Sequence, residues 1–378
     1  MLAGIHKTSN FLSLFKLIVV ISIAITFFLW IYYLQPNQYQ FISSSHPSSN
    51  INRHLVDVFL VKRFLNQTPW DELPNLNLMQ WPQPTVAALP AGRLLKNKTR
   101  APIPLRFDPV ISLGQRRVNQ KLLLKFAEVM DHHGYSDRYF LSSGTMIGSF
   151  RHHDFVPWDD DLDITVDGRL RAWLQKALAD LGPEYRFVKS GRDKLFTRIL
   201  PLDQDNETDV ELSRQTTRFS WGWPFLDISY YDENETHVTE LQKSYGRYYC
   251  WPKEVVFPLL YRPFGKNWFP TPRNPLQSLI ESHGRSHNCE TGPYTHVFEK
   301  GRPAESTRCI LLGSRYAFVQ RRPCLVGSQL AQSGQNMLVE ERLILRATNG
   351  TRKVIHSLCL ASDLSNANAD TYGLDFIE

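Results

Sequence analysis

Cysteine is scarce in this sequence, and the few cysteines form no recognisable metal or redox motif. No Cys-x-x-Cys pair is present, so neither a zinc ribbon nor a thioredoxin-type site is predicted. Their odd number leaves at least one of them outside any intramolecular disulfide. The cysteines are Cys250, Cys289, Cys309, Cys324 and Cys359.

A strong charge, a polybasic block and internal repeats are missing as well. The 378 residues carry a formal net charge of +6. This charge is too small to indicate a nucleic acid as the partner, but it is compatible with an anionic substrate or a membrane surface. Hydrophobic residues make up 42% of the chain and aromatic residues 12%, which is typical of a globular protein.

One apolar run near the N-terminus predicts a membrane anchor. Leu17–Leu34 contains no charged residue, and about 20 apolar residues suffice to span a bilayer. Lys7 and Lys16 precede the run, which places the N-terminus in the cytosol. We therefore predict a cytosolic tail over residues 1–10 and a signal anchor over 11–34. A cleaved signal peptide is the alternative, but its apolar region is shorter, about 7–15 residues, and no A-x-A site follows here.

The segment after the anchor, residues 35–110, is rich in proline. It holds 10 of the 23 prolines, and such a segment buries too little apolar surface to offset its conformational entropy. We predict a stiff lumenal stem. Asn-x-Ser/Thr sequons, of which some arise by chance, fit a lumenal location. They begin at Asn66, Asn97, Asn206, Asn234 and Asn349.

A folded α/β domain is predicted over residues 111–285. Val118, Leu122, Phe126 and Val129 recur at helical spacing and are followed by Gly134, a helix-ending residue. Further helices are predicted at 143–152, 168–181 and 275–283, and strands at 138–141, 159–166, 185–190, 194–200 and 225–231. Helices interleaved with strands favour a mixed fold. Residues 286–378 form a C-terminal extension to which the sequence assigns no role.

An acidic run, Asp159 to Asp163, predicts a metal site. In an extended strand alternate side chains share a face, so Asp159, Asp161 and Asp163 are expected to point the same way. Their mutual repulsion favours a bound cation, and Mg²⁺, or Mn²⁺ in its place, prefers such oxygen ligands. The alternative is a solvated acidic loop. An EF-hand is excluded because its sixth residue should be Gly and its twelfth Glu, whereas Ile164 and Leu170 stand there.

A short turn upstream, Ser143-Gly144-Thr145, lies between a predicted strand and a predicted helix. Glycine lets the backbone approach a ligand closely, and the N–H groups at a helix N-terminus attract anions. The turn therefore indicates a phosphate contact, although the same residues could merely begin a helix. Its combination with the acidic run is the stronger signal.

Together these residues resemble a known family. Residues 141–151, LSSGTMIGSFR, and 155–164, FVPWDDDLDI, are similar to the signature of the LicD, fukutin and fukutin-related protein family, which has a nucleotidyltransferase fold. Looser similarity extends over about 115–285, including residues 225–228 and 264–284. The resemblance implies a mixed sheet covered by helices, with acidic residues on adjacent strands holding a metal.

The resemblance also implies roles for particular residues. Asp159, Asp161 and Asp163 match the family's metal-binding aspartates, and Ser143, Gly144 and Thr145 match its phosphate-contacting turn. Asp227 is the candidate for a further carboxylate, as metal ligand or base, with a buried structural aspartate as the alternative. Arg151 is expected either to pair with a donor phosphate or to lie exposed on a helix. The cysteine-based zinc loop of fukutin-related protein has no counterpart here.

The implied function is transfer of a phospho-alditol (ribitol phosphate-like) or phosphocholine group from a CDP-linked donor to a glycan, with Asp161 or Asp227 accepting the hydroxyl proton. The implied location is the Golgi or endoplasmic-reticulum membrane, as a single-pass type II protein. Two alternatives stay open. One is a Golgi glycosyltransferase with a DxD motif and a nucleotide-sugar donor, and the other is a catalytically inactive glycan-binding or accessory protein. A homo-oligomer is compatible with the sequence.

Overall fold

The computed structural model describes residues 105–362, except 112, 198–199, 202–207, 210–218, 245, 285–287, 327–328, 331, 334–335 and 348. The predicted tail, the anchor Leu17–Leu34 and most of the stem lie outside this range. Within it, no helix is long and apolar enough to cross a membrane.

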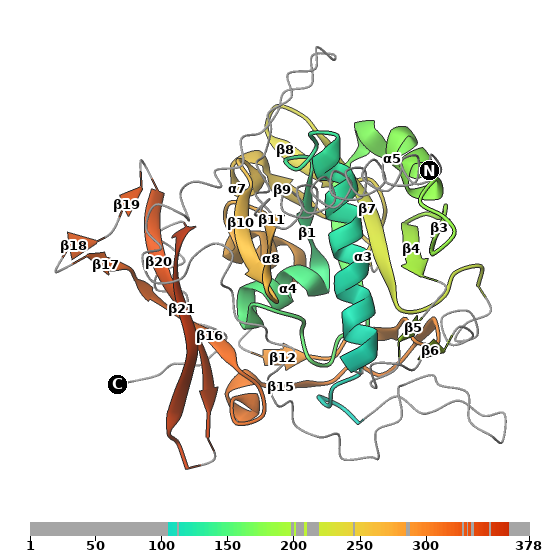
Figure 1. Ribbon diagram of the computed structural model, residues 1–378. Helices are drawn as coiled ribbons and strands as arrows, with labels where there is room; N and C mark the ends of the chain where they lie inside the picture. Colours follow the sequence, from blue (N-terminus) through green and yellow to red (C-terminus); the bar gives the residue numbers. More distant parts are fainter. Residues whose placement is uncertain are drawn as a thin grey trace, which may run out of the picture. The chain divides into compact units, whose positions relative to one another are not determined.

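A mixed sheet forms the centre of the described structure (Figure 1). Its main path runs in the order β1-β2-β7-β4-β3, and β8 and β9 extend it beside β7. β2 and β7 are parallel, whereas the other neighbours are antiparallel. The strands are β1 (Tyr139–Leu141), β2 (Leu162–Asp167), β3 (Tyr185–Val188), β4 (Asp193–Thr197), β7 (Phe225–Glu233), β8 (His237–Glu240) and β9 (Cys250–Pro252). The predicted mixed α/β class is confirmed.

Helices pack against this sheet where the sequence predicts them. In α3 (Leu113–His132), the side chains of Val118, Leu122 and Phe126 are buried in the main core, and Gly134 follows with φ 71°. The same core takes Leu162, Ile164 and Val166 from β2, so the intervening Asp163 faces away from it. The other helices are α4 (Ser143–His152), the 3₁₀ turn η2 (Gly168–Leu170) with α5 (Arg171–Ala179), α7 (Lys253–Val256) and α8 (Pro275–His283).

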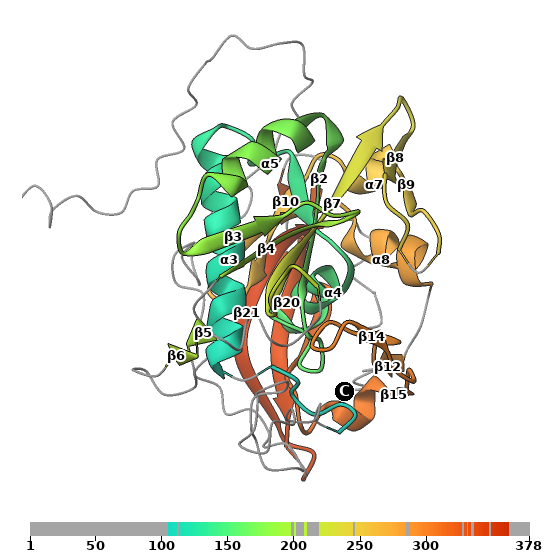
Figure 2. The same cartoon turned by 90° about the vertical axis from the view of Figure 1, so that its right-hand side faces the viewer.

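The C-terminal extension is mostly β-structure. β20 (Asn336–Arg346) and β21 (Arg352–Ser362) form a long antiparallel pair (Figure 2). β16 (Phe318–Pro323) and β19 (Gln332–Ser333) also pair with β20 (Figure 1). Within the extension, short antiparallel pairs are formed by β12 (Asn288–Glu290) with β15 (Ser306–Arg308), β13 (Tyr294–Thr295) with β14 (Lys300–Gly301), and β17 (Leu325–Val326) with β18 (Gln329–Leu330). A 3₁₀ turn, η3, spans Cys309–Leu312. Earlier in the chain, β5 (Leu200–Pro201) pairs with β6 (Thr208–Asp209), and β10 (Leu260–Phe264) pairs with β11 (Asn267–Thr271).

Two disulfides and a buried cluster of polar and charged side chains stabilise the C-terminal extension. Cys289 pairs with Cys309 and Cys324 with Cys359, and Cys250 is a free, exposed thiol. Glu341 on β20 is 1% exposed. Its carboxylate accepts hydrogen bonds from side chains of three other elements or turns: Arg262 at 2.5 Å, Arg321 at 2.8 Å and His153 at 2.7 Å. Since unpaired buried charges are very unfavourable, this cluster makes β10, the end of α4 and the C-terminal sheet depend on one another.

Candidate active site

Three carboxylates meet where β2 and β7 run side by side. Asp163 and Asp227 are direct partners in the register of the two strands, and Asp161 stands just before β2. One oxygen from each lies within 4.8 Å of the others, and the three residues are 7%, 3% and 7% exposed, respectively. Buried carboxylate oxygens at this spacing are the donor set that Mg²⁺ and Mn²⁺ prefer. The residues therefore fit a divalent metal.

Asp159 belongs to a second acidic group, with Asp160 and Asp161. The expected extended strand begins only at Leu162, so Asp159 and Asp161 do not alternate along it with Asp163. Asp160 turns inward instead, where its Oδ2 accepts hydrogen bonds from Thr295 Oγ1 at 2.6 Å and from the backbone N–H of His296 at 3.1 Å. Asp161 is the residue that the two groups share.

Two basic side chains, one on β4 and one in the turn before it, balance the negative charge of Asp163 and Asp227. Lys194 Nζ lies 2.8 Å from Asp227 Oδ1, and Arg192 Nη1 lies 3.6 Å from both Asp163 and Asp227. Burial raises the pKa of Asp227, but the charges of Lys194 and Arg192 outweigh it and lower the pKa below its usual value. Asp227 is thus held as a carboxylate.

The remaining aspartates behave differently. Burial, reinforced by Asp160 and Asp163, raises the pKa of Asp159 to about 7. Burial raises the pKa of Asp163 to about 6, with Arg192 opposing and Asp227 adding to the effect. Burial and the neighbouring Asp163 raise the pKa of Asp161 well above its usual value. Because burial and mutual repulsion disfavour the charged forms of these aspartates, a bound cation would stabilise them as carboxylates.

A histidine from the extension also reaches the cluster. His296 Nε2 lies 3.2 Å from Asp161 Oδ2, and His296 Nδ1 lies 3.3 Å from Glu299 Oε1. Burial lowers the pKa of His296, but Asp161 and Glu299 raise it to about 10 overall. Sequence reasoning missed Lys194, Arg192 and His296, because no spacing links them to the aspartates.

The Ser-Gly-Thr turn lies against the acidic run, as its position in the sequence indicates. Thr145 Oγ1 accepts a hydrogen bond from the backbone N–H of Asp163 at 2.7 Å. A Cβ on Gly144 would lie 2.0 Å from Oδ2 of Asp159, so a larger residue there would displace that carboxylate from its present position. Ser143 begins α4 with a positive φ of 45°. The first turn of α4 and the acidic run are therefore neighbours, as a shared phosphate and metal site requires.

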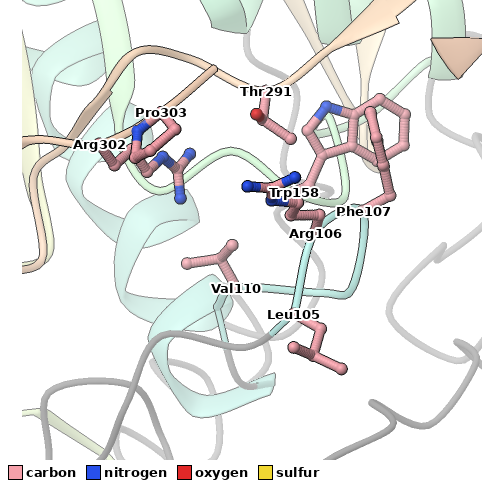
Figure 3. A pocket seen from close by; sticks show the side chains of 8 residues that line it. All are labelled: Leu105, Arg106, Phe107, Val110, Trp158, Thr291, Arg302 and Pro303. Carbon is pink, nitrogen blue, oxygen red and sulfur yellow. The ribbon is translucent and has the colours of Figure 1, made fainter. Parts of the chain in front are cut away.

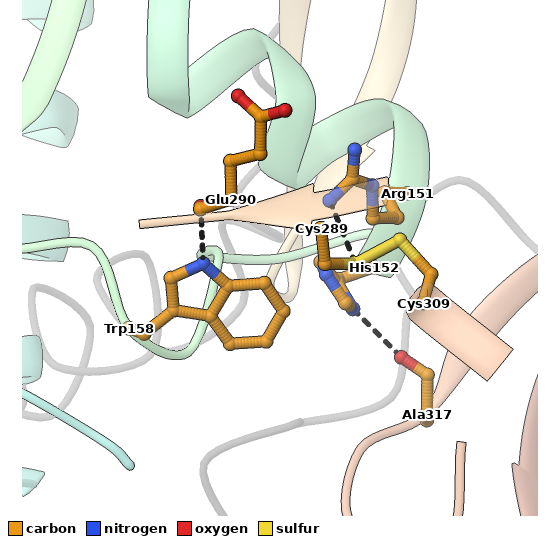
Figure 4. Close-up of a disulfide and its surroundings, with 7 residues drawn as sticks. All are labelled: Arg151, His152, Trp158, Cys289, Glu290, Cys309 and Ala317. Atoms are coloured by element: carbon orange, nitrogen blue, oxygen red, sulfur yellow. Dashed lines mark hydrogen bonds between the residues drawn. A yellow bond between two sulfur atoms is a disulfide. The ribbon is translucent and has the colours of Figure 1, made fainter. Parts of the chain in front are cut away.

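Arg151 is a buried residue of α4. It is 5% exposed, so it is not the exposed helix residue considered as one alternative. It stands near the C-terminal end of α4, where its Nη1 donates to Cys289 Sγ at 3.1 Å (Figure 4). The adjacent His152 donates from Nδ1 to the carbonyl oxygen of Ala317 at 2.8 Å. These contacts place the end of α4 beside the Cys289–Cys309 disulfide and the C-terminal extension.

A pocket of about 200 Å³ lies beside Trp158, the residue before the acidic run. Figure 3 shows Arg106, Arg302 and Trp158 around it. None of the clustered aspartates lines it, and the indole N–H of Trp158 donates to the carbonyl oxygen of Glu290 at 2.9 Å. We therefore place the chemistry at the aspartates and not in this pocket.

A mixed sheet with carboxylates on adjacent strands, next to a Gly-Thr turn, defines a nucleotidyltransferase-type domain. Residues 136–274 match the family model described as LicD/FKTN/FKRP, nucleotidyltransferase domain. The resemblance seen in the sequence is therefore confirmed over these residues. A stretch of 30 residues is 53% identical to the lipopolysaccharide cholinephosphotransferase LicD of Haemophilus influenzae, covering 8% of this chain and 11% of that protein. His296 and Glu341 lie beyond the matched residues.

Proposed function

We propose that this protein is a phosphotransferase that moves phosphocholine or a phospho-alditol (ribitol phosphate-like) group from a CDP-linked donor to a hydroxyl of a glycan. The observation that carries the proposal is the buried set Asp161, Asp163 and Asp227 beside the Gly144-Thr145 turn, within the matched domain. The similar LicD protein, a cholinephosphotransferase by name, supports transfer of a phosphoryl-linked group.

The carboxylates have distinct roles in this proposal. Asp161, Asp163 and Asp227 would hold Mg²⁺ or Mn²⁺, which supplies positive charge to offset the donor pyrophosphate and the departing CMP. Lys194 and Arg192 keep Asp227 ionised, so Asp227 is a poor proton acceptor. Burial and the neighbouring Asp163 raise the pKa of Asp161 above its usual value, so Asp161 is the proposed acceptor of the hydroxyl proton.

The reaction is a single displacement at phosphorus. The acceptor oxygen forms a bond to the donor phosphorus distal to cytidine, and the bond from that phosphorus to the CMP oxygen breaks. The hydroxyl proton moves to a carboxylate, and CMP leaves with the bonding electrons. The backbone N–H groups in the first turn of α4 favour an anion and would bind a donor phosphate.

We also propose a type II membrane topology in the Golgi or endoplasmic reticulum. The uncharged segment Leu17–Leu34 supports an anchor, and two disulfides support an oxidising compartment. The sequon residues Asn234 and Asn349 are exposed, as glycan attachment requires. A mobility shift on deglycosylation that is smaller in the Asn234→Gln/Asn349→Gln variant than in the wild type tests this; an unshifted wild-type chain made in animal cells argues against a lumenal domain.

A donor panel tests the activity. The full-length protein in detergent is incubated with Mg²⁺, a glycan acceptor mixture and either CDP-choline, CDP-ribitol or UDP-sugars, and release of CMP or UDP is measured. We expect CMP release only, abolished by Asp161→Asn and unchanged by Gly191→Ala, whose added Cβ would meet nothing within 4 Å. UDP release alone would identify a glycosyltransferase, and absence of both metal and nucleotide binding would identify an inactive binding protein.

A further inference from the structure

A short hairpin of the C-terminal extension lies against the acidic cluster. This 294–301 hairpin consists of β13, four turn residues and β14. It lies beyond residues 136–274, which match the family domain. Two of its residues contact the acidic run, at two adjacent aspartates.

The first contact attaches the hairpin to Asp160. Oδ2 of Asp160 accepts hydrogen bonds from Thr295 Oγ1 and from the backbone N–H of His296. Asp160 is 2% exposed, and its backbone carbonyl accepts from the indole N–H of Trp223 at 2.5 Å. Because both its side chain and its backbone are bonded in this way, Asp160 fixes where the hairpin lies.

The second contact joins the hairpin to Asp161. His296 lies between Asp161 Oδ2 and Glu299 Oε1. Glu299 is itself fixed, since it accepts from Trp221 Nε1 at 2.9 Å and from Tyr294 Oη at 3.1 Å. The imidazole also packs nearly perpendicular to the ring of Phe225 on β7, at 5.3 Å between centroids. The ring of His296 is thus held on several sides while one nitrogen faces Asp161.

We propose that His296 is a positioning residue for the metal site. Asp161 is not on a strand, so backbone pairing does not orient its carboxylate as it does for Asp163 and Asp227. The contact with His296 Nε2 supplies that orientation by occupying Oδ2, which leaves Oδ1 for a metal. Such partners of ligating carboxylates commonly contribute about 10–100-fold to metal affinity. Glu299 acts one step further out, by holding His296 Nδ1.

This inference rests on the metal site of the proposed function but not on the donor or acceptor. The test therefore measures metal binding first. Mn²⁺ affinity of the full-length protein, without nucleotide, is determined by electron paramagnetic resonance at one fixed pH. We expect His296→Ala to weaken binding about 10–100-fold, His296→Gln to recover part of the loss through its amide nitrogen, and Glu299→Gln to lose less than His296→Ala.

His237→Ala is the matched control, because His237 is an exposed histidine on β8. It should bind Mn²⁺ as tightly as the wild type. In the transfer assay, the Mg²⁺ concentration for half-maximal rate should rise in His296→Ala, while the donor KM at saturating Mg²⁺ stays within about twofold. A purely structural defect would not be repaired by added metal. If His296→Ala fails to fold, as judged by circular dichroism, Glu299→Gln provides the same comparison.

These measurements distinguish the positioning role of His296 from the proposed phosphotransferase function. Unchanged Mn²⁺ affinity in folded His296→Ala and Glu299→Gln overturns the positioning role, whatever the activity. If Mn²⁺ affinity depends on His296 as expected, but the wild type releases no CMP from any CDP-linked donor, the proposed function is overturned and the positioning role stands.

Discussion

Asp227 and Lys194 are direct partners in the antiparallel register of β7 and β4, and their side chains form a buried ion pair of 2.8 Å. On its other side Asp227 is paired with Asp163 of β2. A row of three charged residues therefore crosses three neighbouring strands on one face of the sheet. The middle carboxylate serves both as the candidate metal ligand and as the partner of a buried ammonium group.

Asp227→Asn should therefore damage both activity and stability. The substitution removes a metal ligand and leaves the ammonium group of Lys194 buried without its carboxylate, which typically costs about 3–5 kcal/mol. We expect no CMP release and a lower free energy of unfolding in urea. The double variant Asp227→Asn/Lys194→Met should regain most of the stability but none of the activity. A double variant no more stable than the single one would contradict the pairing.

Gly144→Ala should reduce activity without lowering stability. The new Cβ would meet side-chain atoms of Asp159, which can rotate away, and alanine is a better helix former than glycine by about 1 kcal/mol. Displacing Asp159 disturbs the acidic run. We expect an unchanged or raised melting temperature together with weaker Mn²⁺ binding and slower CMP release.

Gly148→Ala, in the same helix, is the contrasting variant. Its Cβ would lie 2.3 Å from the backbone oxygen of Asp154, and backbone cannot rotate away, so we expect a loss of about 1–3 kcal/mol in stability. Gly191→Ala, with open space around it, should resemble the wild type in both measurements. Equal stability losses in Gly144→Ala and Gly148→Ala would argue against the rotation of Asp159.

Acid should destabilise the C-terminal sheet through one buried histidine, His153, and one partly buried histidine, His356. Burial lowers the pKa of His356 to about 3, and burial also lowers the pKa of His153. The two rings are hydrogen-bonded, Nδ1 of His153 to Nε2 of His356, at 2.9 Å, and His153 contacts Glu341. Since the folded pKa values lie below the unfolded value, the unfolded state binds more protons below pH 6.5, and stability falls as the pH is lowered.

The measurement is the free energy of unfolding between pH 8 and pH 4. Each histidine contributes a slope of up to about 1.4 kcal/mol per pH unit below its unfolded pKa. His356→Asn should therefore show a shallower decline than the wild type, and His237→Asn, at an exposed position, should show the wild-type decline. Identical slopes of unfolding free energy against pH in all three proteins would show that His356 does not cause the acid sensitivity.

Loss of the Cys289–Cys309 disulfide should destabilise the segment that contacts Arg151 and Trp158, close to the acidic run. The disulfide closes a separation of 20 residues, which corresponds to about 3 kcal/mol of stability. Its sulfur contacts Arg151, and the next residue, Glu290, accepts the hydrogen bond from Trp158. We expect Cys289→Ala/Cys309→Ala to lower the melting temperature and change the tryptophan fluorescence, whereas Cys250→Ser should leave both unchanged.

Local patterns in the sequence predict much of the matched domain. The periodicity of Val118, Leu122 and Phe126 predicts α3, Asn274-Pro275 predicts the start of α8, and the apolar run around Asp227 predicts β7. These features depend on neighbours in the chain. Arg151 illustrates the limit, because its place beside Cys289 depends on a segment 138 residues away.

The residues that could not be predicted belong to long-range contacts. His296 lies in a hairpin whose strands have two residues each, too short for any periodicity to show. Its partner Asp161 is 135 positions earlier in the chain. The position of Asp160 is likewise set by Thr295 and not by strand alternation, which is why the acidic run departs from the expected extended strand.

The carboxylate of Glu341 has a consequence for how this chain is made. During synthesis, at about 5–20 residues per second, His153 and Arg262 leave the ribosome well before Glu341, which follows them by 188 and 79 positions. Until then the side chains of His153 and Arg262 lack the carboxylate that makes their burial favourable. Complete folding of the matched domain therefore requires Glu341, a residue beyond 136–274. A nascent chain that is cut short before β20 is therefore expected to be recognised as unfinished.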